Sequence, residues 1–130
     1  MILVDTHVVV WLAFERARLS RKATAAIEEA RKNTDGLAIS AITLLELTTL
    51  LGKGRLSLAV SLESFLQEVE ARFTVLPITG RACAGITSLP ARYPKDQADR
   101  IIGATALVEG LALVTADRAI RNSKIIQTIW

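Results

Sequence analysis

Short apolar runs alternate along this chain with longer segments whose apolar residues recur every three or four positions. The short runs lie at residues 1–4, 37–40, 74–78, 111–115 and 125–130. Because successive side chains of a strand point to opposite faces, such runs predict strands that are buried on both sides. The intervening segments predict helices at residues 8–12, 20–33, 42–51, 61–69, 80–89 and 96–109, with a helical turn at 117–122. Strands that alternate with helices predict a parallel sheet covered by helices on both faces.

Individual residues mark where several of these elements begin or end. Ser20 and Ser61 precede predicted helices and are favourable N-cap residues, and Gly110 is a typical residue to end one. Pro77 lies inside the run at 74–78 and has no backbone N–H to donate to a neighbouring strand. That strand is therefore expected to lie at an edge of the sheet or to end at the proline.

The size and composition of the chain are those of a globular protein. Its 130 residues are 51% hydrophobic and 22% charged, which is enough for one core and predicts a single domain over residues 1–130. The longest apolar stretch, residues 8–14, is far shorter than the ~18 residues of a membrane span. The chain begins without the basic region or cleavage site of a secretory signal, so we expect a cytoplasmic protein.

One cysteine and one histidine limit the available chemistry. They exclude an intramolecular disulfide, cysteine-rich zinc or iron–sulfur sites, and metal motifs with several histidines. Cys83 lies among small residues, which predicts a packed and unreactive thiol. His7 lies two residues after Asp5, where it is either a general base or substrate contact, or a structural residue bonded to backbone groups.

Five acidic residues are expected at one edge of the sheet. Asp5 and Asp117 each follow a predicted strand directly, and Glu46 lies two turns into the helix after another strand. Asp96 and Asp99 open the helix that leads to the fourth strand. Because the carboxyl ends of parallel strands converge, these side chains are expected to share a crevice. Carboxylates held so close repel unless a cation binds them, and an all-oxygen cluster suits Mg²⁺ or Mn²⁺.

Each acid also has a structural interpretation. Asp5 and Asp117 could cap the helices that follow them, and Asp96 and Asp99 have the spacing of an N-cap residue and its N3 partner. For Asp96 a helix cap is at least as good an interpretation as a metal contact. Glu46 has apolar neighbours, which predicts a mostly buried helix where an unpaired carboxylate is costly. Glu46 is therefore a functional residue or an ion-pair partner.

Four segments carry these acids in a fixed order, namely 3–12 (LVDTHVVVWL), 40–47 (SAITLLEL), 96–106 (DQADRIIGATA) and 113–117 (LVTAD), and a further segment, 53–56 (KGRL), lies between the second and the third. Together they resemble the PIN-domain ribonucleases of the VapC toxin type over essentially the whole chain. The resemblance implies a PIN-like α/β/α sandwich on a parallel sheet of about five strands. It also implies a metal-binding quartet of Asp5, Glu46, Asp99 and Asp117, with Mg²⁺ or Mn²⁺ as the cofactor.

The same resemblance implies the activity and the partners. The family consists of endoribonuclease toxins, generally dimeric, each silenced by a VapB-type antitoxin encoded beside it. Two positions depart from the usual pattern: Gln97 stands where a proline is common, and Leu45 stands where a tryptophan often precedes the glutamate. Both changes leave the acids in place, so an active enzyme is expected. Thr115, two residues before Asp117, is a strand residue or a hydrogen-bond donor to one of the acids.

The distribution of charge predicts the substrate. The net charge is +3, but if the five acids gather in one place, the rest of the chain carries sixteen basic and eight acidic groups. Basic pairs at Lys53/Arg55 and Arg92/Lys95 are either solvated surface or phosphate contacts. Aromatic residues make up only 5%, too few for a base-stacking platform. We therefore expect a metal-activated water to cut structured RNA, such as tRNA or rRNA, recognised mainly by shape.

Two other functions fit a small α/β domain with an acidic pocket. A receiver-type phospho-acceptor module that binds Mg²⁺ would need an acceptor aspartate after the middle strand and a lysine after the last but one. The predicted strands end instead in Pro77-Ile-Thr-Gly80 and Thr115-Ala-Asp117, so both residues are missing. A PIN domain that serves only as a non-catalytic scaffold would not need all four acids.

Overall fold

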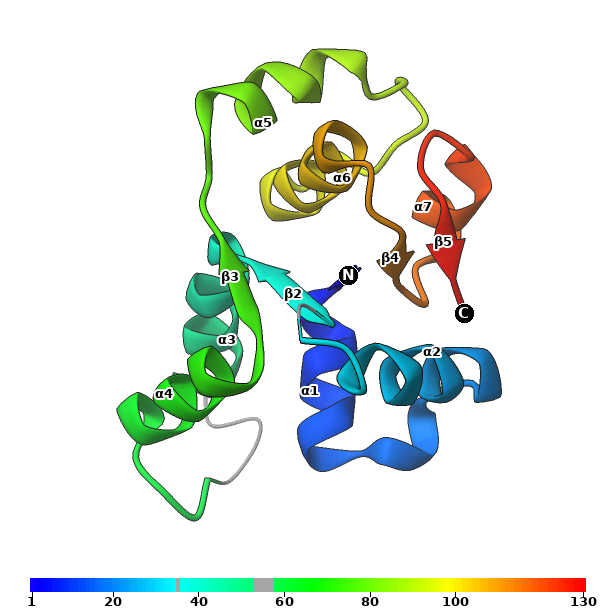
Figure 1. Ribbon diagram of the computed structural model, residues 1–130. Coiled ribbons are helices and arrows are strands. Elements are labelled where there is room, and N and C mark those ends of the chain that lie inside the picture. The colour runs from blue at the N-terminus through cyan, green and yellow to red at the C-terminus, as the bar shows by residue number, and fades with distance from the viewer. Residues whose placement is uncertain (35, 53–57) are drawn as a thin grey trace.

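A five-stranded parallel sheet in the order β3-β2-β1-β4-β5 forms the centre of the computed structural model, which describes residues 1–34, 36–52 and 58–130 (Figure 1). The strands are β1 (Ile2–Val4), β2 (Leu37–Ser40), β3 (Thr74–Leu76), β4 (Leu113–Val114) and β5 (Thr128–Ile129). In the central strand, Leu3 is paired with Ala38 of β2 on one side and with Leu113 of β4 on the other. The predicted parallel sheet is confirmed.

Seven α-helices connect and cover these strands: α1 (Thr6–Phe14), α2 (Arg21–Arg31), α3 (Ala41–Gly52), α4 (Leu62–Arg72), α5 (Gly80–Gly85), α6 (Gln97–Glu109) and α7 (Arg118–Ser123), as counted over the ranges given above. Single 3₁₀ turns lie at Arg16–Arg18 and Ile86–Ser88. Ser20 and Ser61 accept hydrogen bonds as N-caps, and Gly110 ends α6 with a left-handed φ of 65°. In the described segments, no helix is long and apolar enough to cross a bilayer.

Several predicted elements are shorter than the sequence pattern indicated, among them the run at 111–115, which is a strand only at Leu113–Val114. The segment 80–89 is an α-helix only to Gly85 and continues as a 3₁₀ turn, because Ile86, Thr87 and Ser88 favour an α-helix less. The last strand comprises two residues rather than the predicted run at 125–130. These differences concern the ends of the elements and leave the strand order unchanged.

The strand residues alternate between two hydrophobic clusters. Val4, Ile39 and Val114 pack in one cluster with apolar residues of α1, α2 and α4. Leu3 and Leu113 pack in the other cluster with residues of α6 and α7. Helices therefore cover both faces of the sheet (Figure 1), which is why β1 and β4 at its centre are apolar at every position.

The edge strand β3 ends at Leu76, directly before Pro77. Both alternatives for the proline are met, because the strand lies at the edge and also stops there.

The order of the strands creates a crevice beside β1. From β1 the chain proceeds through β2 and β3 on one side, and later returns to add β4 and β5 on the other side. Such a reversal separates the connections that leave the two neighbouring strands, and ligands of open parallel sheets bind at this point. Asp5 follows β1 and Asp117 lies three residues after β4, so both acids are at the crevice.

A glycine inside α6 gives a first testable prediction. A Cβ atom at Gly103 would lie 2.1 Å from the hydroxyl oxygen of Tyr93, whose ring is fully buried and cannot move aside easily. We expect Gly103→Ala to lower the free energy of unfolding by about 1–3 kcal/mol, as overpacking does. Gly80→Ala is the control because a Cβ there meets nothing within 4 Å. Urea unfolding of both variants measures the difference, and equal stabilities would contradict the predicted clash.

Candidate active site

A pocket of about 240 Å³ opens at the carboxyl ends of β1 and β4. It is lined by Asp5, His7, Trp11, Asp99, Ala116 and Asp117. Three of the four acids predicted as metal ligands therefore face one space, although they come from three separate segments of the chain. Asp5 precedes α1, Asp99 lies in the first turn of α6, and Asp117 precedes α7.

The fourth acid, Glu46, lines a second hollow of about 500 Å³ together with Asp96. A hydrogen bond connects Glu46 to the first pocket, because Thr6, the residue after Asp5, donates from Oγ1 to Glu46 Oε1 at 2.6 Å. The second hollow has apolar walls, and two of its residues, Leu45 and Ile78, are 62% and 43% exposed. The five predicted acids thus lie at one edge of the sheet, divided between two hollows.

Hydrogen bonds fix the buried Asp5 at the end of β1. Its Oδ1 accepts from the backbone N–H of Thr6 at 2.8 Å, and its Oδ2 accepts from Thr115 Oγ1 at 2.7 Å. Thr115 Oγ1 in turn accepts from the backbone N–H of Asp117 at 3.1 Å. One buried hydroxyl therefore connects the ends of β1 and β4, which confirms Thr115 as a donor to an acid.

A threonine pair orients Glu46. The Oγ1 atoms of Thr6 and Thr43 lie 2.9 Å apart, and both residues are buried. Since the hydroxyl hydrogen of Thr6 is used by Glu46, Thr43 donates to Thr6. The sequence analysis missed both residues. The available signal was a polar residue, Thr43, on the apolar side of a helix, where a buried hydroxyl needs a partner.

Asp96 and Asp117 also act as helix caps. Asp96 Oδ1 accepts from the backbone N–H of Asp99 at 3.0 Å and Asp117 Oδ1 accepts from that of Ile120 at 3.1 Å. The N-cap interpretation of Asp96 is confirmed. The buried Tyr93, which the sequence analysis did not identify, donates its hydroxyl to the carbonyl oxygen of Asp99 at 3.1 Å. These contacts hold the first turn of α6 while leaving the Asp99 carboxylate directed at the pocket.

Two expectations about individual side chains are wrong. Leu45 is exposed and Glu46 is only half-buried, so α3 is less buried than its sequence suggested. Cys83 is exposed on the wall of the second hollow rather than packed, because α5 buries Ala82 and Gly85 instead. His7 is exposed beside Trp11 with ring centroids 6.3 Å apart, at the mouth of the acidic pocket.

The predicted basic pairs are placed only in part. Lys53 and Arg55 lie outside the described residues. Arg92 donates from Nη2 to the carbonyl oxygen of Ser123 at 2.8 Å, so it connects the loop before α6 to the end of α7. Lys95 is exposed at the end of the same loop, directly before Asp96.

Burial, with a smaller contribution from neighbouring carboxylates, raises the pKa of three of these acids. Burial raises the pKa of Asp5 and the pKa of Glu46 above their ordinary values. Burial, reinforced by the charges of Asp5, Asp96, Glu46 and Asp117, raises the pKa of Asp99 to about 7. In the described part of the chain, every ion pair involves other acids (Glu15, Glu29 or Glu68). Within those residues, none of the five acids at this edge of the sheet forms an ion pair.

The chemistry of the donors fits a hard divalent cation. Carboxylate and hydroxyl oxygens surround the pocket, and these are the atoms that Mg²⁺ and Mn²⁺ prefer. Over residues 1–34, 36–52 and 58–130, no group of three or more acidic, histidine or cysteine side chains is arranged so that it could hold a metal ion. Several of the carboxylate oxygens accept hydrogen bonds from threonine hydroxyls and helix ends instead.

Comparison with known proteins identifies the family. The profile of the PIN domain matches residues 2–125. This chain belongs to the PIN-domain family. A relative named Ribonuclease VapC22, from Mycobacterium tuberculosis, is 39% identical over 131 residues, which cover 99% of this chain and 98% of that protein. The resemblance of this PIN domain to the VapC type is therefore confirmed.

Solved structures of similar fold come from VapBC complexes. The VapBC2 structure from Rickettsia felis, bound to a promoter DNA fragment, gives a TM-score of 0.74 at 19% identity and covers 98% of this chain and 97% of that one. The DNA-bound VapBC structure from Salmonella typhimurium gives 0.70 at 26% identity, with the same coverage. The α/β/α fold is confirmed, and its strand order differs from the 2-1-3-4-5 order of receiver domains, which excludes that alternative.

The raised pKa of Asp99 predicts how the stability of this PIN domain depends on pH. Asp99 ionises near pH 4 in the unfolded chain and at about 7 in the folded protein. Between these values the folded protein holds a proton that the unfolded chain releases, so the free energy of unfolding falls as the pH rises. Because Asp99 is partly exposed, we expect a loss of about 1–2 kcal/mol from pH 4 to pH 8 in EDTA.

Thermal unfolding in EDTA across this pH range measures the effect. Asp99→Asn is the control, since its amide does not titrate and its stability should depend less on pH. Parallel pH profiles for the two proteins would contradict the prediction.

Proposed function

We propose that this PIN domain is a divalent-metal-dependent endoribonuclease and the toxin of a type II toxin–antitoxin pair. The observation that carries the proposal is the group of carboxylates at the carboxyl edge of the sheet, none of which forms an ion pair with a basic residue in the described parts of the chain. The relative at 39% identity is named a ribonuclease, which supports the same reaction. Retention of all four acids argues against a purely structural scaffold.

The roles of the residues follow from their positions. Asp5, Glu46, Asp99 and Asp117 would hold Mg²⁺ or Mn²⁺. The bound ion would supply a water of lowered pKa and offset the charge that develops on the phosphodiester. Thr115 would fix the positions of Asp5 and Asp117 through its hydrogen bonds to both residues. Thr6 would fix the position of Glu46 through the bond that its hydroxyl donates. The reaction requires no side-chain nucleophile, in agreement with a chain that has one exposed histidine and one cysteine away from Asp5 and Asp117.

The substrate that we propose is structured RNA, such as a tRNA or an rRNA hairpin. Arg100 and Arg118 each follow one of the acids in sequence, so basic groups start near the pocket that would receive the scissile phosphate. Tyr93 is buried and Trp11 is partly buried, so few aromatic rings are free to stack on bases. Recognition would then depend on phosphates and RNA shape rather than on base identity.

RNA binding is expected to depend strongly on salt and on RNA structure. Each phosphate that the protein neutralises should add close to one unit to the slope of log K against log salt. The Asp99→Asn variant allows binding to be measured without cleavage, using a folded tRNA and an unstructured oligonucleotide over a salt series. Equal affinity for the two RNAs, or a slope near zero, would contradict recognition through phosphates and RNA shape.

Two protein partners complete the proposal. A VapB-type antitoxin would inhibit the toxin, which is supported by the VapBC structures among the structural neighbours. An arginine from the antitoxin would match the acidic pocket, since its planar charge pairs with carboxylates in two parallel hydrogen bonds. A second copy of the chain would cover exposed apolar residues such as Leu45 and Ile78. Sedimentation of the isolated chain as a monomer at micromolar concentration would contradict the homodimer.

The decisive experiment is an RNA cleavage assay with and without a divalent ion. Purified protein is incubated with total tRNA and rRNA with and without Mg²⁺, and the new 5′ ends are mapped by sequencing. Defined ends that depend on the divalent ion and on Asp99 support the proposal. Absence of new ends under all conditions, in protein that is folded by circular dichroism, would contradict it.

A further inference from the structure

The acidic pocket has a wall of a second kind. Besides its three carboxylates, it is lined by Ala116 and by two aromatic side chains of α1, His7 and Trp11. These two residues are four positions apart and therefore lie on the same side of the helix, one turn or about 6 Å along its axis. A hard divalent ion prefers oxygen ligands, so metal binding does not account for this aromatic wall.

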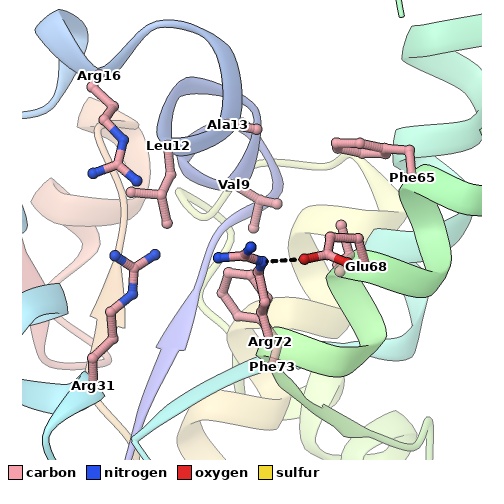
Figure 2. A pocket seen from close by; sticks show the side chains of 10 residues that line it. Val9, Leu12, Ala13, Arg16, Arg31, Phe65, Glu68, Arg72 and Phe73 are labelled. Atoms are coloured by element: carbon pink, nitrogen blue, oxygen red, sulfur yellow. Dashed lines mark hydrogen bonds and ion pairs between the residues drawn. The ribbon is translucent and has the colours of Figure 1, made fainter. Parts of the chain in front are cut away.

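The opposite side of α1 faces a different part of the molecule. Val9, Leu12 and Ala13 line a separate pocket of about 270 Å³, together with residues of α4 (Figure 2). At ~100° per residue, these positions lie on the other side of the helix from His7. Val9 and Leu12 also belong to the hydrophobic core. Packing of α1 through that side therefore turns His7 toward the acids.

Contacts with several neighbours hold the Trp11 ring in place. Trp130, which follows β5, lies against it with ring centroids 5.7 Å apart. The guanidinium carbon of Arg18 lies 4.5 Å from the centroid of the same ring, which is a favourable contact between a cation and an indole face. The His7 ring lies 6.3 Å from Trp11 between centroids, tilted by 54°. Trp11 is thus a fixed support, and His7 is the exposed ring beside it.

The His7 ring is open to a ligand. The hydrogen bonds at this edge of the sheet involve the acids, the threonines and helix ends, and within the described ranges none of them involves the His7 side chain. The described contacts therefore do not include the backbone partners that a structural histidine would need. An exposed flat ring at the rim of the acidic pocket is what a second flat ring could cover.

We propose that His7, supported by Trp11, stacks on the base of a nucleotide adjacent to the scissile phosphate, and that this base is unpaired. The proposal rests on the ribonuclease function proposed above and names a substrate contact within the same site. Every base has a π-face that stacks on an aromatic ring, so the contact agrees with recognition by RNA shape. A base inside a duplex is covered by its neighbours, so cleavage is expected in loops, bulges or single-stranded ends.

Tryptophan fluorescence detects the base without cleavage. The chain has two tryptophans, so Trp130→Phe leaves Trp11 as the single emitter, and Asp99→Asn in the same protein prevents cleavage. We expect a hexamer of adenylate to quench the fluorescence of Trp11. A hexamer of abasic ribose phosphate should bind at least about fivefold more weakly and leave the fluorescence unchanged. Absence of quenching by oligoadenylate in folded protein, or equal quenching by the abasic chain, would overturn the proposal.

Variants of His7 then separate stacking from proton transfer or hydrogen bonding. His7→Ala should weaken binding of oligoadenylate about fivefold or more. His7→Phe keeps a ring without a nitrogen and should recover most of the lost affinity, whereas His7→Gln keeps hydrogen-bonding groups without a ring and should behave as His7→Ala does. Recovery by His7→Gln but not by His7→Phe would overturn the proposal, because the side chain would then act through a polar atom.

Phe14→Ala is the matched control for the loss of an aromatic ring from α1. Phe14 is exposed at the end of the same helix but stacks on Phe65 of α4, with ring centroids 5.4 Å apart. Its loss should leave the affinity for oligoadenylate unchanged. A decrease in Phe14→Ala as large as in His7→Ala, with both proteins folded by circular dichroism, would overturn the assignment of the contact to His7.

The results also distinguish this proposal from the nuclease activity on which it rests. If wild-type protein cuts RNA, but His7→Ala cuts it at the same rate and oligoadenylate causes no quenching, the base contact alone is wrong. If oligoadenylate quenches Trp11 and His7→Ala weakens its binding, but wild-type protein cuts no RNA, the base contact holds and the nuclease proposal fails. Mapped 5′ ends that lie inside duplex stems would overturn the base contact while supporting the nuclease.

Discussion

Asp99→Asn is expected to lower RNA cleavage at least about a thousandfold while leaving the protein folded. The asparagine has nearly the same shape, so it removes charge from the pocket without creating a cavity. The hydrogen bonds that hold the first turn of α6 involve the backbone of Asp99, with Asp96 accepting from its N–H and Tyr93 donating to its carbonyl oxygen. Both bonds survive the substitution, and a cleavage assay beside a circular dichroism spectrum measures the two parts of the expectation.

Asp96→Asn is the matched control for that variant. Asp96 lies three residues earlier on the same turn and its described contact is a helix cap, which an asparagine makes about as well. Cleavage should therefore remain within about threefold of wild type. If Asp96→Asn loses as much activity as Asp99→Asn, then Asp96 belongs to the reacting site and the assignment of the quartet is wrong.

Removal of divalent ions should have an equally large effect. We expect excess EDTA to stop cleavage completely and added Mg²⁺ or Mn²⁺ to restore it, because the three acids that line the pocket offer carboxylate oxygens, which these ions prefer. A second measurement does not depend on activity. At pH 8, where Asp99 is mostly ionised, the ion should raise the melting temperature of the wild-type protein by offsetting the repulsion among the acids.

The Asp99→Asn variant again provides the control. Its melting temperature without ions should exceed that of wild type, and the increase caused by Mg²⁺ should be smaller. Cleavage by wild-type protein in excess EDTA would exclude the proposed mechanism. An equal thermal shift in both proteins would mean that the ion binds away from Asp99.

Much of this architecture follows from local sequence pattern. The strands are apolar on both faces and follow helices at regular intervals, which is sufficient to predict the parallel sheet. Asp5 and Asp117 could be located because each lies at or just past the end of such a strand, where the topology brings the chain ends together. Asp96 could be recognised as a cap because the signal lies within one helical turn.

Contacts between distant segments could not be predicted in the same way. The Thr6–Thr43 pair spans 37 positions and the Thr115–Asp5 bond spans 110. A local pattern contains no information about which hydroxyl will meet which carboxylate at such separations. The errors at Leu45 and Cys83 have a related cause: periodicity identifies an apolar side chain but not whether a neighbouring helix covers it.

The bond between Thr115 and Asp5 also has a consequence for synthesis of the protein. Thr115 is translated 110 residues after Asp5, and Asp117 follows it. Strand β4, which holds this threonine against β1, can dock only after the residues between them have been made. A nascent chain that stops short of Asp117 therefore carries an incomplete acidic pocket, and the whole site can form only once that residue has left the ribosome.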